Sequence, residues 1–489
     1  MAESGTNSGL ASELPLVLRR GDGVALHTQI ERSIRTGIRS GRLPRGTVLP
    51  PTRTLAADLG VSRGVVVEAY EQLVAEGYLT SRSGGYTEVA IDAEDRPAAP
   101  PRRPAPRLGI DFGYGRADVA HFPRTAWSRS VRRVLVEAPN ERFGYLDGRG
   151  APELCAALAG YLNRVRDTSI RAENVVVCNG YAQGISLVVG VLAAAGARRI
   201  AVEDPSADDD ARPAAAACGL EVVGVPVGPV GVDVAALERS GADAVVLTPS
   251  HQWPTGAVLS ADARLAVARW AERTGAVVVE DDYDAEYRYD RTPLGAMQGI
   301  APDHVVYAGT TSKTVAPGLR LGWLVVPPRL VDAVAAAKEA ADRGSPVLDQ
   351  LAFADFLDRG ELDRQRRRMR PVYRRRRDTL LAALRERLPE LEPAGAAAGM
   401  HLVTWLPPGL DESAVVAAAA GRDVGVYGVG PYRLAPGRDG LIFGYSALGE
   451  QAIAEGVRRL AGAIGDLRAQ RGAGGTGKGR PRRPSVAPS

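Results

Sequence analysis

The hydrophobic positions in the N-terminal part of the chain predict helices first and strands afterwards. Ile30, Ile34 and Ile38 recur at every fourth position, which places them on one face of a helix. Two shorter helical segments follow at residues 52–59 and 63–76. The N-terminal part is therefore expected to be mostly helical up to residue 76.

The junction between the two shorter helices has the composition of a tight turn. Gly60 breaks the first helix, and Ser62 can cap the second. Residues 77–91 (GYLTSRSGGYTEVAI) predict a strand, a Gly-Gly turn and a second strand. A helix–turn–helix followed by a β-hairpin is a winged helix, and a helix–turn–helix of these proportions is typical of DNA-binding proteins.

The larger part of the chain alternates apolar strands with helical segments, which predicts a parallel α/β sheet. The expected strands span residues 175–178, 199–203, 244–248, 276–280, 305–309 and 321–326. Polar clusters lie at their carboxyl ends: NGYAQ, DPSADDD, PSHQWPTG, DDYD and TTSK. Ligands bind at such strand ends in open α/β sheets, so the sequence predicts a small-molecule site there.

Composition divides the chain into segments. We expect a disordered N-terminus at residues 1–13 and a winged-helix domain at 14–91. A linker rich in Pro, Ala and Arg follows at 92–108. The α/β block occupies 109–466, and the Gly-, Pro- and Arg-rich segment 467–489 is expected to be disordered.

Charge and cysteine content exclude several classes of protein. The net charge of +4 is smaller than the six basic residues of segment 467–489, so the basic total describes a tail and indicates no nucleic-acid surface. No apolar run reaches the roughly 18 residues of a membrane span, and no signal peptide is indicated. The three cysteines are far apart, which favours a reducing cytoplasm over disulfides or a metal site.

Lysine is rare in this chain. Of 61 basic residues only Lys313, Lys338 and Lys478 are lysines. A neutral lysine amine can form a Schiff base, which arginine cannot do. Lys478 lies in the tail and Lys338 in an alanine-rich helical stretch, whereas Lys313 follows an apolar strand in GTTSKT. Lys313 is therefore the candidate for covalent chemistry.

The residues around Lys313 suit a phosphorylated ligand. Thr310, Ser312 and Arg320 supply the hydroxyls and the forked cation that phosphate prefers. Asp281 follows another apolar strand, and a buried carboxylate there needs a cationic partner such as a protonated pyridine nitrogen. The combination describes pyridoxal 5′-phosphate bound covalently to Lys313.

Two of the polar clusters also have ordinary structural explanations. NGYAQG can cradle a phosphate at a helix N-terminus, but glycine turns between strands and helices are common. EDDYD can be a solvated acidic turn, although Tyr283 lies on the same strand face as Asp281. The prediction therefore depends on the whole set of clusters.

Two long segments together resemble one protein family. EDDYDAEYRYDRTPLGAMQG followed by DHVVYAGTTSKTVAPGLRLGWLVVP resembles the MocR-type subfamily of GntR-family transcription regulators. GRLPRGTVLPPTRTLAADLGVSRGVVVEAYEQLVAEGYLTSRSGGYTEVA resembles the GntR signature, and the likeness extends over residues 24 to about 466. It implies a winged helix fused to a fold type I, class I aminotransferase-like domain, with a mostly parallel large-domain sheet and a smaller α+β domain.

The resemblance implies a role for each candidate. Lys313 would form the Schiff base, Asp281 would pair with the pyridine nitrogen, and Tyr283 would bond the ring hydroxyl. The phosphate would be held by Thr310, Ser312, Arg320, Gly180, Tyr181 and Ala182. Tyr145 resembles the tyrosine that reaches the phosphate from the partner subunit, and a core or interface aromatic explains it equally well.

The chain departs from the family pattern at three positions. Ala207 stands where relatives carry an aromatic residue that stacks on the cofactor ring, and Asp209 where some relatives have an arginine contact. Trp253 takes the place of the asparagine of the aminotransferase NPTG motif, although a core tryptophan is an equal alternative. We expect a looser cofactor site and effector recognition unlike that of the GABA-responsive relative. Arg438, and after it Arg433, is the candidate for an effector carboxylate, and each alone is also an ordinary surface arginine.

In the winged helix, the resemblance implies contacts with phosphates or bases. Gly84 and Gly85 would let the wing approach a groove, whereas Gly64 and Val65 replace polar residues usual at the start of the recognition helix. The arginine-rich segment 364–388 is expected to be an amphipathic helix with a solvated face, with auxiliary DNA contact as the alternative. The predicted DNA-binding set is Arg53, Ser62, Arg63, Arg82, Gly84 and Gly85.

The sequence predicts a regulator that binds a double-stranded DNA operator, with pyridoxal 5′-phosphate as cofactor. The resemblance implies a homodimer, because fold type I sites combine residues of two subunits, and a dimer would present two winged helices to two half-sites. The effector of the regulator would be an amino-acid-like molecule or pyridoxal phosphate itself. The alternative is an active aminotransferase that carries a DNA-binding domain. No metal is expected.

Overall fold

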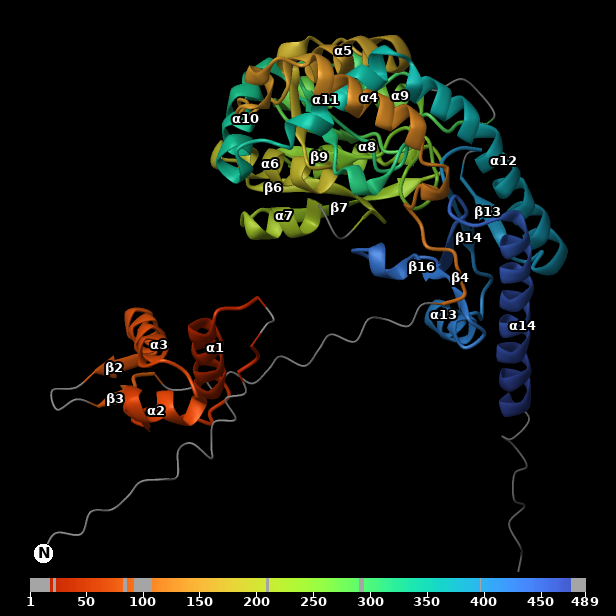
Figure 1. Ribbon diagram of the computed structural model, residues 1–489. Helices are drawn as coiled ribbons and strands as arrows, with labels where there is room; N and C mark the ends of the chain where they lie inside the picture. The colour runs from red at the N-terminus through yellow and green to blue at the C-terminus, as the bar shows by residue number, and fades with distance from the viewer. Residues whose placement is uncertain are drawn as a thin grey trace, which may run out of the picture. The chain divides into compact units, whose positions relative to one another are not determined.

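The computed structural model describes residues 18–20, 23–81, 86–91, 108–207, 211–289, 294–395 and 397–475 (Figure 1). The chain divides into two compact units, Met1–Ala105 and Pro106–Ser489. Within the described ranges, no helix is both long and apolar enough to cross a membrane.

The first unit is a winged helix, as predicted. Its helices are α1 Leu26–Arg39, α2 Thr52–Leu59 and α3 Arg63–Ala75. Its antiparallel sheet has the order β1-β3-β2, with β1 Val48–Leu49, β2 Leu79–Ser81 and β3 Thr87–Val89. Ile30, Ile34 and Ile38 are buried, as their spacing indicates, in the core of this unit.

The turn between α2 and α3 uses glycine as expected. Gly60 ends α2 with a φ of 61°, a left-handed conformation that glycine adopts without strain. Ser62 occupies the N-cap of α3, but its side chain makes no capping hydrogen bond. The amide of Val65 donates instead to the backbone oxygen of Ser62, at 3.1 Å, so the predicted side-chain cap is wrong.

The second unit is built on a large mixed sheet with the order β5-β12-β11-β10-β9-β6-β7-β8. The strands are β5 Val175–Cys178, β6 Arg199–Asp204, β7 Glu221–Gly228, β8 Gly231–Val232, β9 Ala244–Leu247, β10 Val277–Asp281, β11 Val305–Thr310 and β12 Gly322–Val325. The helices are α4 Arg124–Glu137, α5 Pro152–Arg166, α6 Tyr181–Ala194, α7 Ala211–Ala217, α8 Val234–Arg239, α9 Ala261–Thr274, α10 Pro328–Asp342 and α11 Val347–Asp358.

Helices cover both faces of this sheet because its strands are apolar on both sides. Val175 and Val177 of β5 pack in the core that includes α5 and α11. Val176 and Cys178, which point the other way, pack with α6 and α10. Figure 1 shows α5 and α11 above the strands of this sheet and α7 below them.

β12 runs antiparallel to both of its neighbours, β11 and β5. The segment between Thr310 and Gly322 is too short for the crossover that a parallel connection requires. This reversal leaves Lys313 in the tight connection at the carboxyl end of β11.

A smaller sheet completes the second unit, with the order β13-β14-β17-β16. Its strands are β13 Glu392–Ala394, β14 His401–Trp405, β16 Tyr427–Gly428 and β17 Gly440–Gly444, and it packs with α12 Glu361–Arg387, α13 Glu412–Ala420 and α14 Glu450–Gly475. A short parallel pair joins β4 Ile110–Asp111 to β15 Val424–Gly425. The 3₁₀ turns are η2 Val119–His121, η3 Asn140–Phe143, η4 Ala172–Asn174, η5 Met297–Gly299, η6 Pro317–Leu319 and η7 Gly430–Tyr432.

Two helices of this smaller part refine the sequence prediction. α12 is amphipathic as expected, with Met369 and Tyr373 buried on its inner face. α14 continues to Gly475, past the boundary placed at residue 466, so the expectation of disorder from residue 467 is wrong for residues 467–475. Leu467 packs against the core and Arg468 pairs with Glu390 at 2.7 Å, which explains why the helix continues.

Candidate functional site

A cavity of about 420 Å³ lies at the carboxyl ends of β6, β9, β10 and β11, where the polar clusters were predicted to meet. Lys313, Asp281, Tyr283 and Arg320 all line it. So do Thr310, Ser312, Tyr181 and Ala182. The fold therefore brings together residues that lie up to 139 positions apart, between 181 and 320, in one crevice.

Lys313 projects from the short connection between β11 and β12. Its Nζ donates a hydrogen bond to the backbone oxygen of Gly115 at 2.6 Å. Gly115 has a φ of +68°, which side chains rarely adopt, and a Cβ at this position would lie 2.8 Å from Nζ, so another residue here would strain the backbone and displace the amine. This backbone contact helps to hold the lysine amine in the cavity.

Lys338 has a different environment. It is fully buried in α10, where its Nζ contacts both carboxylate oxygens of Asp342, at 2.5 and 2.7 Å, and the hydroxyl of Ser345 at 3.1 Å. The Asp342 carboxylate also accepts hydrogen bonds from Asn179 and Gln183, at 2.9 and 2.7 Å. Burial alone would raise the pKa of Asp342, but the bonds from Lys338 and Gln183 keep it below its usual value.

This Asp342 network fixes the start of α6. Asn179 immediately precedes Gly180, the N-cap residue of α6, and the Asn179 amide donates to Gln183 Oε1 at 2.8 Å. Sequence patterns do not indicate the network, because its members are ordinary polar residues that lie far apart in the chain.

The N-terminus of α6 and Arg320 form one side of the cavity. Gly180 has a φ of +92°, and a Cβ there would lie 3.3 Å from both terminal nitrogens of Arg320. The guanidinium donates to the backbone oxygen of Asn179. Thr310 Oγ1 donates to Ser312 Oγ at 3.0 Å. Helix amides, hydroxyls and a guanidinium are the donors that bind a phosphate group.

Asp281 ends β10, and Tyr283 follows it on the cavity wall. The Tyr283 hydroxyl donates to the backbone oxygen of His251 at 2.9 Å. Burial, together with the charges of Asp284 and Asp281, raises the pKa of Tyr283 well above its usual value. Tyr283 therefore remains a neutral hydrogen-bond donor or acceptor in the cavity.

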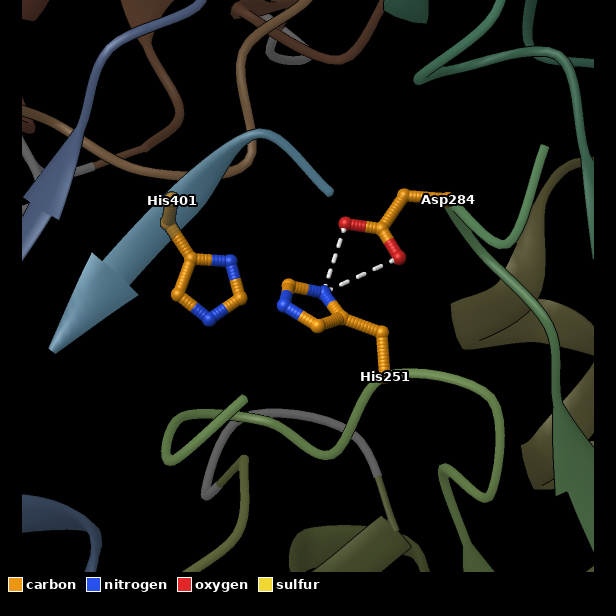
Figure 2. A group of neighbouring side chains, drawn as sticks. All are labelled: His251, Asp284 and His401. Atoms are coloured by element: carbon orange, nitrogen blue, oxygen red, sulfur yellow. Dashed lines mark hydrogen bonds and ion pairs between the residues drawn. The ribbon is translucent and has the colours of Figure 1, made fainter. Parts of the chain in front are cut away.

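A buried group of His251, Asp284 and His401 lies beside Tyr283 (Figure 2). Figure 2 shows the His251 ring between the other two side chains, with its Nδ1 3.1 and 3.2 Å from the carboxylate oxygens of Asp284. One ring nitrogen of each histidine and one carboxylate oxygen of Asp284 all lie within 4.8 Å of one another. His401 Nε2 lies 3.2 Å from the backbone oxygen of Pro254, so each ring has its own polar partner.

Two departures from the family pattern, Ala207 and Trp253, also line the cavity. Ala207 contributes only a methyl group there, and Asp209 lies outside the described residues. Trp253 is 8% exposed and packs between the cavity and a small core with Val403. Its ring centroid is 4.2 Å from that of Tyr114, so an aromatic contact replaces the amide that an asparagine would offer.

Three predicted side chains do not line the cavity. Tyr145 is 95% exposed on the surface of the second unit. Arg438 pairs with Glu392 at 3.2 Å, and the guanidinium groups of Arg433 and Arg438 lie over the ring of Trp405 at 5.9 and 5.8 Å. The Trp405 ring holds both arginines outside the cavity, and the Glu392 carboxylate holds Arg438 there as well, so this placement does not support their predicted contact with an effector carboxylate.

The predicted DNA-binding residues are partly described. Arg53 near the start of α2, and Ser62 and Arg63 at the start of α3, are exposed. Arg63 Nε lies 3.4 Å from Thr52 Oγ1. Arg82, Gly84 and Gly85 lie outside the described residues.

A winged helix and a lysine-bearing cavity in an aminotransferase-type fold together define a class of two-domain regulators. Residues 26–89 match the family of bacterial regulatory proteins of the gntR type, and residues 109–433 match aminotransferase class I and II. The chain belongs to the MocR-type subfamily of GntR-family transcription regulators, and so combines a DNA-binding domain with an aminotransferase-like domain.

The relatives support this assignment over most of the chain. The probable rhizopine catabolism regulatory protein MocR of Rhizobium meliloti is 33% identical, covering 92% of this chain and 96% of its own. The pyridoxine biosynthesis transcriptional regulator PdxR of Corynebacterium glutamicum is 30% identical, with 91% and 97% covered. The crystal structure of the α-aminoadipate aminotransferase LysN from Thermus thermophilus is similar, with a TM-score of 0.66 and 28% identity. The match covers 74% of this chain and 93% of the LysN chain.

Proposed function

We propose that this regulator binds pyridoxal 5′-phosphate in the cavity of its second unit, and that the occupied cavity controls DNA binding by its first unit. The observation that carries the proposal is the position of Lys313. It is the one lysine among the described lining residues, and it shares the cavity with phosphate donors and with Asp281.

The residues present fit the cofactor. Lys313 would hold the cofactor at its aldehyde through the side-chain amine, which lysine can present in neutral form. Arg320, Thr310, Ser312 and the start of α6 at Gly180, Tyr181 and Ala182 would hold the phosphate. When bound, the cofactor supplies an electrophilic aldehyde and a ring that accepts electrons.

Two further contacts would orient the ring. Asp281 would pair with the protonated pyridine nitrogen, and Tyr283 would bond the ring hydroxyl. His251 holds the Tyr283 hydroxyl from the other side, through its backbone oxygen at 2.9 Å. The Asp284 carboxylate in turn fixes the His251 ring.

The substitutions in the cavity favour a sensor over an efficient enzyme. Trp253 replaces the amide of the aminotransferase NPTG motif, and Ala207 replaces the aromatic residue that stacks on the cofactor ring in relatives. The alternative, an active aminotransferase with a DNA-binding domain, keeps support from the 2-aminoadipate transaminase of Thermus thermophilus, which is 30% identical over 368 residues. Sustained keto-acid production from added amino acids would favour that alternative.

The domain boundaries follow from the same proposal. Residues 14–91 would bind the operator, 109–466 would bind the cofactor, and 92–108 would connect them. A homodimer would present two winged helices to two half-sites. The exposed Tyr145 would then reach the cofactor phosphate in the partner subunit.

The test compares DNA binding with and without cofactor. Affinity of the full-length protein for the intergenic DNA beside its own gene is measured with and without pyridoxal 5′-phosphate. The affinity of the wild type for this DNA should differ between the two conditions. Lys313→Arg, which keeps the charge but cannot present a neutral amine, should not respond. Lys478→Arg changes a lysine of segment 467–489, to which the proposal gives no role, and provides the control. A wild type that ignores the cofactor, or a Lys313→Arg variant that responds fully, would contradict the proposal.

A further inference from the structure

Four aromatic side chains line the cavity without a role in the proposed cofactor site: Tyr114, Trp253, His401 and Tyr432. The ring centroid of Trp253 lies 4.2 Å from that of Tyr114, 4.5 Å from that of His401 and 5.9 Å from that of Tyr432. The hydroxyls of Tyr114 and Tyr432 are hydrogen-bonded to each other. These four residues come from separate segments and form what we call the aromatic wall.

The aromatic wall lies beside the reactive amine. Tyr114 immediately precedes Gly115, whose backbone oxygen accepts the hydrogen bond from Lys313. The charge of Lys313 also contributes to the low pKa of His401, which indicates that the two groups are close. A small molecule that occupies the space next to Lys313 therefore lies against the aromatic wall.

The wall carries no positive charge at neutral pH. Burial is the main cause that holds the pKa of His401 well below 6.5, and the neighbouring His251 and Lys313 lower it further. Figure 2 shows that the nearby carboxylate, Asp284, contacts the His251 ring. His401 therefore does not gain the carboxylate partner that would favour its protonated form.

A buried acid lies in the same cavity. Glu203 is 3% exposed, and its Oε2 accepts hydrogen bonds from the amide and the hydroxyl of Thr248, at 2.9 and 2.7 Å. The same Thr248 hydroxyl accepts a hydrogen bond from the amide of Trp253, at 3.0 Å, so Glu203 is linked to the wall. Burial raises the pKa of Glu203 to about 7, against these hydrogen bonds, which indicates an acid whose ionised form would be stabilised by a cation.

The cationic side chains in and near the cavity are committed to groups other than the aromatic wall and Glu203. Among the described lining residues the permanent or potential cations besides the histidine are Lys313 and Arg320, which the proposed function assigns to the cofactor aldehyde and phosphate. Arg433 and Arg438 lie outside the cavity, against Trp405. Acids are more numerous: Glu203, Asp281 and Asp284 all line the cavity. A bound phosphate would add further negative charge.

We propose that the effector of this regulator is an amine that carries a second organic cation, and that the aromatic wall and Glu203 recognise this cation. The inference rests on the proposed function for the cofactor end of the cavity. Aromatic faces attract ammonium and guanidinium groups at centroid distances up to about 6 Å, most strongly at tryptophan. A carboxylate in the same place would face aromatic rings and acids, and Arg320 is the one arginine among the described lining residues.

The test uses three ligands that share a primary amine and a similar chain length. Putrescine ends in an ammonium group, γ-aminobutyrate ends in a carboxylate, and n-pentylamine ends in a methyl group. Each is titrated calorimetrically into full-length protein loaded with pyridoxal 5′-phosphate. Putrescine should bind about tenfold more tightly than either of the others, the range expected of a desolvated cation–aromatic contact.

Two variants locate the contact. Trp253→Leu should remove most of the preference for putrescine. Trp127→Leu, at a tryptophan of α4 that does not line the cavity, should keep it. If Trp253→Leu fails to fold, Glu203→Gln, which removes the charge and keeps the size of the side chain, should lower the affinity for putrescine and leave that for n-pentylamine unchanged.

Three results would overturn the inference: equal or tighter binding of γ-aminobutyrate, equal binding of n-pentylamine, or no binding of putrescine to the cofactor-loaded protein. Failure of the proposed function is recognised separately, because the wild type would then show no visible absorption from a lysine–cofactor adduct before any ligand is added.

Discussion

Gly180 offers a specific test of the phosphate end of the cavity. Its backbone has a φ of 92° and a ψ of 176°, a conformation that is essentially restricted to glycine. A Cβ added there would lie 3.3 Å from both terminal nitrogens of Arg320 and 3.5 Å from Cζ. Gly180→Ala therefore combines backbone strain with displacement of the guanidinium that we assign to the phosphate.

A second glycine near α6 separates the two effects. Gly196 has a φ of +98°, and a Cβ there would meet no atom within 4 Å. Alanine at either position should reduce the free energy of unfolding by about 1–3 kcal/mol through backbone strain. Only Gly180→Ala should also weaken a charged hydrogen bond to the cofactor. Such bonds contribute about 1.5–3 kcal/mol, which corresponds to about a tenfold to hundredfold loss of affinity.

The two variants are compared by urea unfolding of the apoprotein and by titration with pyridoxal 5′-phosphate, followed by visible absorbance. We expect similar losses of stability, with loss of cofactor affinity in Gly180→Ala alone. If Gly180→Ala binds the cofactor as tightly as Gly196→Ala does, the start of α6 and Arg320 do not form the phosphate site.

Three other changes test separate parts of the molecule. Asp281→Asn should lower cofactor affinity, because an amide cannot stabilise a pyridinium charge. A buried pair broken on one side costs about 3–5 kcal/mol, which is an upper bound for this half-buried residue. Unchanged affinity in the absorbance titration would exclude the pairing of Asp281 with the pyridine nitrogen. Burial raises the pKa of Glu203 from its usual value of 4.5 to about 7, so the free energy of unfolding of the wild type should fall as pH rises from 4.5 to 7. In urea unfolding at these two pH values, Glu203→Gln should show a smaller fall than the wild type. An equal fall in both proteins would contradict the raised pKa of Glu203. Deleting residues 476–489 should flatten the salt dependence of binding to any DNA and preserve the preference for the operator over random DNA. Arg63→Ala should lose roughly 1–3 kcal/mol of binding free energy on the operator if Arg63 reads a base. Both variants are measured at two salt concentrations, and loss of operator preference in the deletion but not in Arg63→Ala would refute the assignment of specificity to the winged helix.

The fold and the residues at the strand ends of the cavity could be predicted from the sequence for a physical reason. Apolar strands followed directly by polar residues place those residues at one sheet edge, whatever the details of packing. Lys313, Asp281 and Arg320 could therefore be assigned to one crevice before their distances were known. Lysine is rare in this chain, and Lys313 alone among the three lysines directly follows an apolar strand.

Contacts between distant segments could not be predicted in this way. The aromatic wall joins Tyr114, Trp253, His401 and Tyr432, and none of their local patterns indicates the other three. The same is true of the Asp342 carboxylate, which holds Asn179 across the start of α6.

The predictions for arginine side chains show a related limit. Position near a late strand suggested Arg438 as a partner for a carboxylate, but Trp405 and Glu392 offer that guanidinium an aromatic face and an ion pair outside the cavity. A long flexible side chain takes the partner that its surroundings provide, and sequence position alone does not show which partner that is.

The attachment of the cofactor to Lys313 is the central claim, and peptide mapping tests it most directly. Full-length protein is incubated with pyridoxal 5′-phosphate, reduced with borohydride, digested, and analysed by mass spectrometry. The account predicts one modified peptide, which contains Lys313. Modification at Lys338 or Lys478, or no modified peptide at all, would contradict it.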